Sequence, residues 1–276
     1  MKRANRPGID ELEQHALAIR RHVVRLVARN GQGYVQQGLG AAEIFTHLWF
    51  AEAELDPSDP SWACRDRIFL STAHNSALFH ATLAERGLIP MEKLQTYTKD
   101  GSQLEINVSE RLGRLVEATC GSLGQGLSVA AGSALSARRR GQNYRCYVIL
   151  GDGELQEGQV WEATMFAASN KLGNLHMIID YNDMQVDGST RNVITMEPIA
   201  EKFAAFGWAV SRVDGHDFKQ LADAFDDARD RPDQPTVIIA DTIVGKGVSF
   251  LEGKKSHNMV FPQEVAELAL SELGAR

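Results

Sequence analysis

The chain has 276 residues, enough for one large domain or two small ones, and its composition is that of an ordinary globular protein. Acidic side chains outnumber basic ones, 36 to 29, so the formal net charge is -7 and the basic footprint of a nucleic-acid-binding protein is excluded. The N-terminal residues lack the apolar core of a signal peptide, and no run reaches the roughly 18 apolar residues of a membrane span. We therefore expect a cytoplasmic protein that binds neither nucleic acid nor membrane.

The first elements predicted along the chain are helical. Apolar residues recur at three- and four-residue spacing between Leu12 and Leu26, which predicts a helix with one buried face and with Asp10 as its cap. A glycine-rich stretch at 30–40 is expected to be a loop, and residues 41–50 are expected to form a second helix.

The remaining chain alternates between strand and helix patterns. Five short apolar segments are typical of strands in a parallel sheet covered on both faces: RIFLS, YRCYVIL, LHMIIDY, WAVSRV and PTVIIADTI. Helical stretches that end in glycine lie between them. This alternation predicts an α/β fold, a doubly wound and mostly parallel sheet with helices on both faces.

No internal repeat, low-complexity tract or shift in composition marks a linker, so we expect residues 1–276 to form a single domain with a C-terminal helix at about 262–273. The three cysteines, Cys64, Cys120 and Cys146, have neither the even count nor the close spacing of a disulfide framework or a zinc site. A reducing compartment fits this cysteine usage best.

Two of the predicted strands end in polar groups suited to one hard cation. YRCYVIL runs into the turn Gly151-Asp152-Gly153, and LHMIIDY runs directly into Asn182. In a parallel sheet both ends lie at the edge where ligands bind. Asp152, the Asn182 side-chain oxygen and a nearby backbone carbonyl can supply three oxygen ligands to Mg²⁺ or Ca²⁺, and bound phosphate and water can supply the rest. The glycines let a phosphate approach the backbone closely.

The two motifs are one strand-helix-strand unit apart, which is the spacing of the thiamine diphosphate signature. GDGELQEGQVWEA followed by IIDYNDMQVDG closely resembles the cofactor motif of transketolases. Three further segments match that family in order, over nearly the whole chain: RIFLSTAH resembles its strand ending in Ser-Lys-Gly-His, and CGSLGQGLSVAAG and TIVGKGVSFLE resemble later segments. The resemblance implies the diphosphate-binding half of a transketolase-like thiamine diphosphate enzyme.

The resemblance also implies roles for individual residues. Asp152, Asn182 and the backbone carbonyl of Met184 would hold Mg²⁺ (or Ca²⁺). Gly151 and Gly153 would lie against the diphosphate. These five residues form the expected metal and diphosphate site.

The other implied residues surround the reacting end of the cofactor. Gly121 and Leu123 would contact the aminopyrimidine through their backbones, and Asp180 matches a family acid beside the reacting carbon. His74 and His257 match histidines near the thiazolium and the diphosphate, and with Asp180 they are the expected catalytic residues. An isolated histidine is more often a core or surface residue than a ligand, but His74 follows a strand at the expected edge of the sheet.

The sequence departs from the family pattern at two positions expected near the donor sugar. The family's Gly-His-Pro-Gly-Gly loop falls on residues 33–37, so Tyr34 replaces its histidine, and Asn107 replaces a second one. Tyrosine and asparagine form hydrogen bonds, but neither carries protons near pH 7. Tyr34 and Asn107 therefore predict an unusual ketose or acyl donor.

In this family a second module binds the pyrimidine and supplies an activating glutamate and the acceptor-phosphate site. The sequence ends soon after its expected C-terminal helix, so we expect a separate C-terminal transketolase-like subunit, with two copies of each chain in an α2β2 heterotetramer. The expected activity is that of a transferase: a two-carbon ketol unit passes from a ketose, phosphorylated or otherwise anionic, to an aldehyde. This chain is expected to be active only with its partner subunit.

Two alternatives remain open at this point. The α subunit of a 2-oxo acid dehydrogenase or decarboxylase shares the Gly-Asp-Gly to Asn signature, whereas the segments SLGQG and GKGVSF favour a transketolase. A non-catalytic, thiamine-binding regulatory subunit is a second alternative, and the intact metal residues argue against it. The sequence names neither the donor nor the acceptor.

Overall fold

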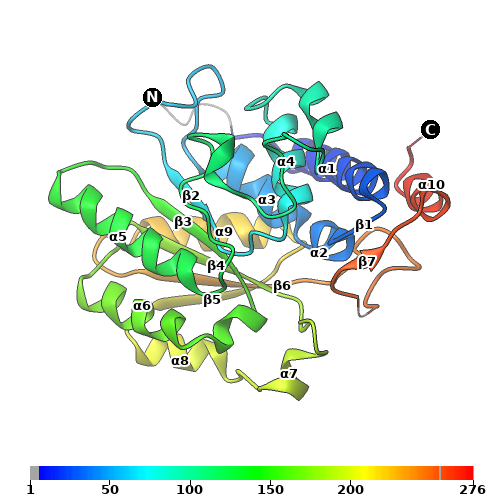
Figure 1. Cartoon of the computed structure of the whole chain (residues 1–276). Coiled ribbons are helices and arrows are strands. Elements are labelled where there is room, and N and C mark those ends of the chain that lie inside the picture. The colour runs from blue at the N-terminus through cyan, green and yellow to red at the C-terminus, as the bar shows by residue number, and fades with distance from the viewer. Residues whose placement is uncertain (1–5, 255, 276) are drawn as a thin grey trace.

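The computed structural model describes residues 6–254 and 256–275, in which helices and strands alternate as predicted (Figure 1). The strands are β1 (Gln32–Gly33), β2 (Arg67–Leu70), β3 (Cys146–Gly151), β4 (Leu175–Tyr181), β5 (Ala209–Asp214), β6 (Thr236–Asp241) and β7 (Met259–Val260). The α-helices are α1 (Ile9–Asn30), α2 (Val35–Gly40), α3 (Ala42–Thr46), α4 (Ser76–Glu85), α5 (Gln125–Arg139), α6 (Gly158–Ser169), α7 (Thr190–Val193), α8 (Ile199–Ala205), α9 (Phe218–Arg229) and α10 (Gln263–Glu272). Four short elements are a π-helical turn, η1 (His47–Glu52), and the 3₁₀ turns η2 (Met91–Thr96), η3 (Glu110–Leu112) and η4 (Gly153–Gln156).

The central sheet consists of five parallel strands in the order β2-β3-β4-β6-β5, and these are the five segments predicted as strands. The predicted doubly wound α/β fold is confirmed. A separate two-stranded antiparallel sheet pairs β1 with β7, so that Gly33 lies opposite Met259. This pairing brings the segment around His257 next to the start of α2.

Helices cover both faces of the sheet, which explains why its strands are apolar without interruption. Successive side chains of a strand point to opposite faces. Tyr147 and Ile149 of β3 pack in one core with α1, α3, α4 and α9. Val148 and Leu150 pack in the other core with α5, α6 and α8. In Figure 1 the blue and cyan helices α1, α3 and α4 lie on one side of the sheet and the green and yellow helices α5, α6 and α8 on the other.

The first helix begins earlier than its predicted cap. Gly8, with extended backbone, is the N-cap of α1, and no side chain caps it, so the prediction of Asp10 as the cap is wrong. Asp10 lies within the first helical turn, where its carboxylate still faces the positive end of the helix dipole. The buried stripe of α1 runs from Leu12 to Val27, as the spacing predicted.

The stretch at 30–40 is largely helical, so the prediction of a loop is also wrong there. Its last six residues form α2, which packs on α1. Gly38 allows the close approach, because a Cβ atom at this position would lie 2.9 Å from Cγ1 of Val23. The tertiary contact therefore outweighs the low helix propensity of glycine. As a consequence, Gln37 is held on an ordered helix.

The C-terminal helix α10 packs on α1, and the guanidinium group of Arg21 donates two hydrogen bonds to the carbonyl oxygen of Leu273, at 2.9 and 2.6 Å. Within residues 6–254 and 256–275, every helix is too short or too polar to cross a lipid bilayer. The cytoplasmic location expected from the sequence stays a prediction.

Candidate functional site

A cavity of about 250 Å³ opens at the carboxyl ends of β2, β3 and β4. The structure brings nine of the twelve predicted site residues to its wall: His74, Leu123, Gly151, Asp152, Gly153, Asp180, Asn182, Met184 and His257. The other three predicted residues, Tyr34, Asn107 and Gly121, are not part of the wall. The residues expected to bind the metal and the diphosphate thus line one cavity.

Strand register places the two expected side-chain metal ligands next to each other. Gly151 of β3 lies opposite Asp180 of β4, so the residues that follow these strands emerge side by side at the sheet edge. Asp152 is 2% exposed, and Asn182 is half-buried. An acid and an amide therefore face the same space.

Backbone amides hold the Asp152 carboxylate in place. Oδ1 accepts a hydrogen bond from the Gly153 N–H at 2.8 Å, and Oδ2 accepts one from the Asp183 N–H at 2.6 Å. Asp183 has a left-handed backbone, with φ of 53°, and the Ser189 and Thr190 hydroxyls hold its side chain. Burial, and then the charge of Asp180, raises the pKa of Asp152 to about 7. A bound cation would oppose that shift and favour the ionised ligand.

Asp180 orients the amide of Asn182. Nδ2 of Asn182 donates to Asp180 Oδ2 at 3.1 Å, while Oδ1 of Asn182 accepts from the Met184 N–H at 3.0 Å. The hydroxyl of Thr242 donates to the other oxygen of Asp180. Burial raises the pKa of Asp180 above its usual value. Through these contacts Asp180 holds the Asn182 amide in place, and the expected catalytic role of Asp180 stays a prediction.

A second buried carboxylate, Glu154, joins three segments around the cavity. Oε1 accepts hydrogen bonds from the Ser71 hydroxyl and, at 2.6 Å, from the Gly124 N–H. Oε2 accepts one from the Gly151 N–H at 3.2 Å. Burial raises the pKa of Glu154. These bonds fix the turn that carries Leu123 against the end of β3, and this link was not predicted from the sequence.

Three rings meet beside the cavity. The ring centroids of Tyr34 and His74 are 5.0 Å apart, those of Tyr34 and His257 are 5.1 Å apart, and those of the two histidines are 5.3 Å apart. Burial, with a smaller effect of His257, lowers the pKa of His74 to about 4, and burial also lowers the pKa of His257. Both histidines are therefore neutral at pH 7. Tyr34 thus supports the two cavity histidines, whereas Asn107 is exposed to solvent.

The cavity wall is acidic. It carries five carboxylates and, among its described residues, no lysine or arginine: Asp152, Glu154, Glu157, Asp180 and Asp187. No group of three or more His, Cys, Asp or Glu side chains suited to a metal ion occurs among the residues that the structure describes. The predicted ligand set is of another kind, because only Asp152 belongs to those types and the others are an amide and a backbone carbonyl.

Among the polar wall residues that sequence reasoning missed, Gln37, Thr72 and Asn75 lie near the two histidines. Thr72 and Asn75 flank His74 directly after β2, and polar residues after a buried strand were the signal that could have found them. Gln37 had no such signal, because its helix was expected to be a loop.

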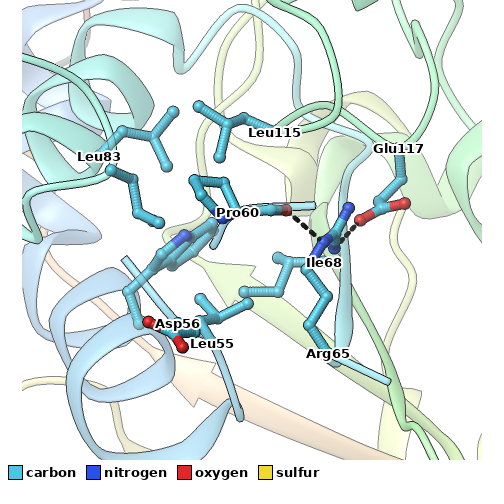
Figure 2. A pocket seen from close by; sticks show the side chains of 10 residues that line it. Leu55, Asp56, Pro60, Arg65, Ile68, Leu83, Leu115 and Glu117 are labelled. Carbon is cyan, nitrogen blue, oxygen red and sulfur yellow. Dashed lines mark hydrogen bonds and ion pairs between the residues drawn. The ribbon is translucent and has the colours of Figure 1, made fainter. Parts of the chain in front are cut away.

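A second pocket lies at the opposite end of β2 (Figure 2). Its volume is about 20 Å³, room for no more than a water molecule. Figure 2 shows Arg65 pointing toward both Pro60 and Glu117. Its guanidinium group donates a hydrogen bond to the carbonyl oxygen of Pro60 and forms an ion pair with the Glu117 carboxylate. We therefore assign no ligand to this pocket.

The fold and the cavity define a doubly wound domain that presents an acid, an amide and two glycines at the edge of its sheet. Residues 12–274 match the family described as transketolase, thiamine diphosphate binding domain. The chain belongs to this family, so the resemblance inferred from its motifs is confirmed.

Several relatives are similar over almost their whole length. A transketolase family protein of Sinorhizobium fredii is 44% identical, with 93% of each chain covered. A 6-deoxy-6-sulfo-D-fructose transketolase subunit of a Clostridium species is 39% identical, with 95% of this chain and 96% of the relative covered. An apulose-4-phosphate transketolase subunit of Actinobacillus succinogenes is 38% identical, with 96% of each covered.

Solved transketolases share the fold. The transketolase of Campylobacter jejuni superposes with a TM-score of 0.90 at 30% sequence identity. The match covers 98% of this chain but 43% of that transketolase. The chain therefore spans less than half of the length of a transketolase that it matches in structure.

Proposed function

We propose that this chain is the N-terminal subunit of a transketolase-like transferase, which moves a two-carbon ketol unit from a ketose to an aldehyde with thiamine diphosphate and Mg²⁺ (or Ca²⁺). The observation that carries this proposal is the cavity in which Asp152 and Asn182 meet at adjacent strand ends. Family membership supports the cofactor and the reaction class. When bound, thiamine diphosphate supplies the nucleophilic carbon that accepts the ketol unit.

The acidity of the wall supports a metal ion. A diphosphate placed about 4 Å from an ionised carboxylate is repelled by about 4 kcal/mol per charge pair at an effective dielectric constant of about 20. The described wall offers no lysine or arginine to offset this repulsion. A divalent ion on Asp152, Asn182 and the Met184 carbonyl would reverse its sign. The oxygen donors match the preference of Mg²⁺, which keeps some of its ligands from phosphate and water.

The remaining residues act through hydrogen bonds and position. His74 and His257, neutral at pH 7, can each donate one hydrogen bond and accept another at the reacting end. Asp180 holds Asn182, and Glu154 holds the turn at Leu123, where the backbone is expected to meet the aminopyrimidine. The chain thus orients the cofactor and excludes water from one side only, because the cavity is open.

We propose that a C-terminal transketolase-like subunit closes the other side, in an α2β2 assembly. Two relatives are named as transketolase subunits, and this chain spans less than half of a full transketolase. Large apolar side chains are exposed on the cavity rim and on the adjacent helices α5 and α6: Leu123, Val129, Met165, Phe166 and Val186. A partner subunit seated over the cavity rim and these helices would bury such side chains. The partner would bring the pyrimidine-binding module and the activating glutamate.

The donor is proposed to be an unusual ketose. Two relatives carry names with uncommon sugars, 6-deoxy-6-sulfo-D-fructose and apulose 4-phosphate. Tyr34, in contact with both cavity histidines, is placed to affect the donor directly. Asn107 is exposed in this chain and would act only where the partner covers it.

The two alternatives have less support. The relatives named above are transketolases or transketolase family proteins, which does not favour the α subunit of a 2-oxo acid dehydrogenase. The co-located Asp152 and Asn182 argue against a regulatory subunit without catalysis.

The deciding experiment is reconstitution of this chain with the C-terminal transketolase-like subunit encoded in the same genome. The pair would be tested with ketose phosphates, ketose sulfonates and 2-oxo acids as donors, and each chain would be tested alone. We expect ketol transfer by the pair only. Turnover of 2-oxo acids without ketol transfer, or steady turnover by this chain alone, would contradict the proposal.

A further inference from the structure

Three buried polar atoms on the cavity wall have no hydrogen-bond partner in the described part of the chain. They are Oε1 of Gln37, Oγ1 of Thr72 and Oδ1 of Asn75, in residues that are 4%, 2% and 2% exposed. An unmet buried polar group costs about 1–3 kcal/mol, and native proteins hold few of them. Other buried atoms without described partners, such as Oε1 of Gln36, lie away from the cavity, but these three share one cavity wall, where a ligand can reach them.

These atoms come from two distant segments that the fold brings together. Thr72 and Asn75 lie between β2 and α4, on either side of His74. Gln37 lies on α2, and its Nε2 is 3.1 Å from Nδ1 of His257. The two histidine rings, 5.3 Å apart, join the segments. We call the surface formed by Gln37, Thr72 and Asn75 the polar wall.

The polar wall is continuous with the proposed metal site but chemically different from it. Cγ2 of Thr72 lies 3.4 Å from the position that a Cβ atom on Gly151 would occupy, next to the turn of Asp152. The metal site offers an ionised carboxylate, whereas the polar wall offers neutral amide and hydroxyl groups. A ligand can therefore contact both along one cavity.

The unmet atoms select for hydrogen-bond donors. The amide oxygens of Gln37 and Asn75 only accept hydrogen bonds, and the Thr72 hydroxyl both accepts and donates. Phosphate, sulfonate and carboxylate groups offer mainly acceptors near pH 7, so they cannot satisfy an amide oxygen. Carbohydrate hydroxyls can, because each carries a donor proton. The polar wall thus fits the hydroxylated part of a sugar rather than its anionic end.

We infer that Gln37, Thr72 and Asn75 recognise hydroxyl groups of the donor ketose and determine which ketose is accepted. This inference rests on the proposed function and deepens it by assigning donor specificity to residues outside the metal site. Gln37 also positions His257: its amide N–H donates to Nδ1, so the neutral imidazole carries its proton on Nε2.

The test uses the reconstituted enzyme with Gln37→Met, Thr72→Val and Asn75→Leu, which keep side-chain volume and remove the hydrogen-bonding atom. For each variant, kcat/KM is measured with an accepted ketose and with analogues that each lack one hydroxyl. We expect the unmodified enzyme to prefer the full ketose by about 10- to 100-fold for a recognised hydroxyl. The variant facing that hydroxyl should lose most of the preference. Its affinity for thiamine diphosphate with Mg²⁺, measured by calorimetry, should change less than about 3-fold.

Gln36 provides a matched control on the same helix. It is 1% exposed, and its Oε1 also has no partner in the described chain, but it is not part of the cavity wall. Its Nε2 donates to the carbonyl oxygen of Leu251 at 3.1 Å. Gln36→Met should therefore affect the melting temperature but leave the preference for hydroxyls unchanged.

The outcomes separate this inference from the proposed function. If the unmodified enzyme transfers ketol units and all three variants keep its preference, the inference is wrong and the proposed function stands. If the variants lose cofactor affinity by about 10-fold without a change in preference, the polar wall binds the cofactor and the inference is again wrong. If no ketose in the panel is a donor, the proposed function fails and the inference fails with it.

Discussion

The two ends of strand β2 carry pockets that differ in how far their polar groups are satisfied. At the amino end (Figure 2), the guanidinium group of Arg65 donates to the backbone carbonyls of Pro60, Asp66 and Arg114 and pairs with Glu117. At the carboxyl end, Thr72 and its neighbours leave buried polar atoms without partners in the described chain. The Arg65 guanidinium group at the amino end is complete in partners, whereas the carboxyl end holds buried polar atoms that lack partners in the described chain.

This difference distinguishes a structural pocket from a binding cavity better than shape does. Buried polar groups that satisfy one another stabilise the fold and leave little for a ligand. Buried groups that lack partners, next to carboxylates without a described cation, gain most when a ligand arrives.

The largest effect is expected from Asp152→Ala, at the incomplete end. Loss of the ionised ligand should weaken binding of thiamine diphosphate with Mg²⁺ by about 1000-fold, or roughly 4 kcal/mol. Calorimetry with the reconstituted pair measures this affinity, and circular dichroism shows whether the variant is folded. Asp187→Ala is the charge-matched control, because Asp187 also lines the cavity but is exposed and does not follow a strand end. Equal losses in both variants would mean that general charge, not a ligand position, controls binding.

At the complete end, Arg65→Met should lower the free energy of unfolding by about 3 kcal/mol, because it removes the closer cation of the half-buried Glu117 carboxylate, which keeps only Arg67 at 3.8 Å, and leaves three backbone carbonyls without their donor. Cofactor affinity should stay within about 2-fold of the unmodified protein. Urea unfolding and calorimetry measure the two quantities. Adding Glu117→Leu should recover part of the stability, since a half-buried carboxylate whose remaining partner is the more distant Arg67 is then removed. A drop in cofactor affinity would contradict the separation of the two ends.

The sequence indicated the carboxyl end but only part of its composition. Asp152 and Asn182 could be located because an uninterrupted apolar strand predicts where its own carboxyl end falls, and parallel strands share that edge. Gln37 could not be located in this way. Its position depends on the contact between α2 and α1, which overrides the local preference for a loop at its glycines. Local pattern thus predicted strands and strand ends, and long-range packing decided the rest of the wall.

An unmet buried group away from any cavity should influence stability alone, and His47 tests this. Its ring is stacked on Phe225 with centroids 5.2 Å apart, and neither ring nitrogen has a partner in the described chain. Burial lowers the pKa of His47 to about 4. Between about pH 6.5 and pH 4 the unfolded chain binds a proton that the folded chain does not, so stability falls as the pH is lowered.

The free energy of unfolding should fall by about 2 kcal/mol less in His47→Phe than in the unmodified protein when the pH is lowered from 7.5 to 4.5, as measured by urea unfolding at both pH values. The variant should leave cofactor affinity at pH 7.5 unchanged. An unchanged pH dependence would show that His47 is not neutral in the folded protein.

The smallest effect is expected from the two positions where family histidines are replaced. In Tyr34→His, the new imidazole would stand beside His74 and His257, where a proton carrier could reach the donor. We expect relative kcat/KM for xylulose 5-phosphate, against the preferred donor of the reconstituted enzyme, to rise by about 10-fold, or about 1.4 kcal/mol. Asn107→His should raise the same relative kcat/KM by less than about 2-fold, because Asn107 is exposed and is not part of the cavity wall. A larger effect of Asn107→His than of Tyr34→His would mean that the partner subunit moves Asn107 to the donor. If xylulose 5-phosphate is already the preferred donor and neither substitution changes its use, the proposal of an unusual donor is wrong.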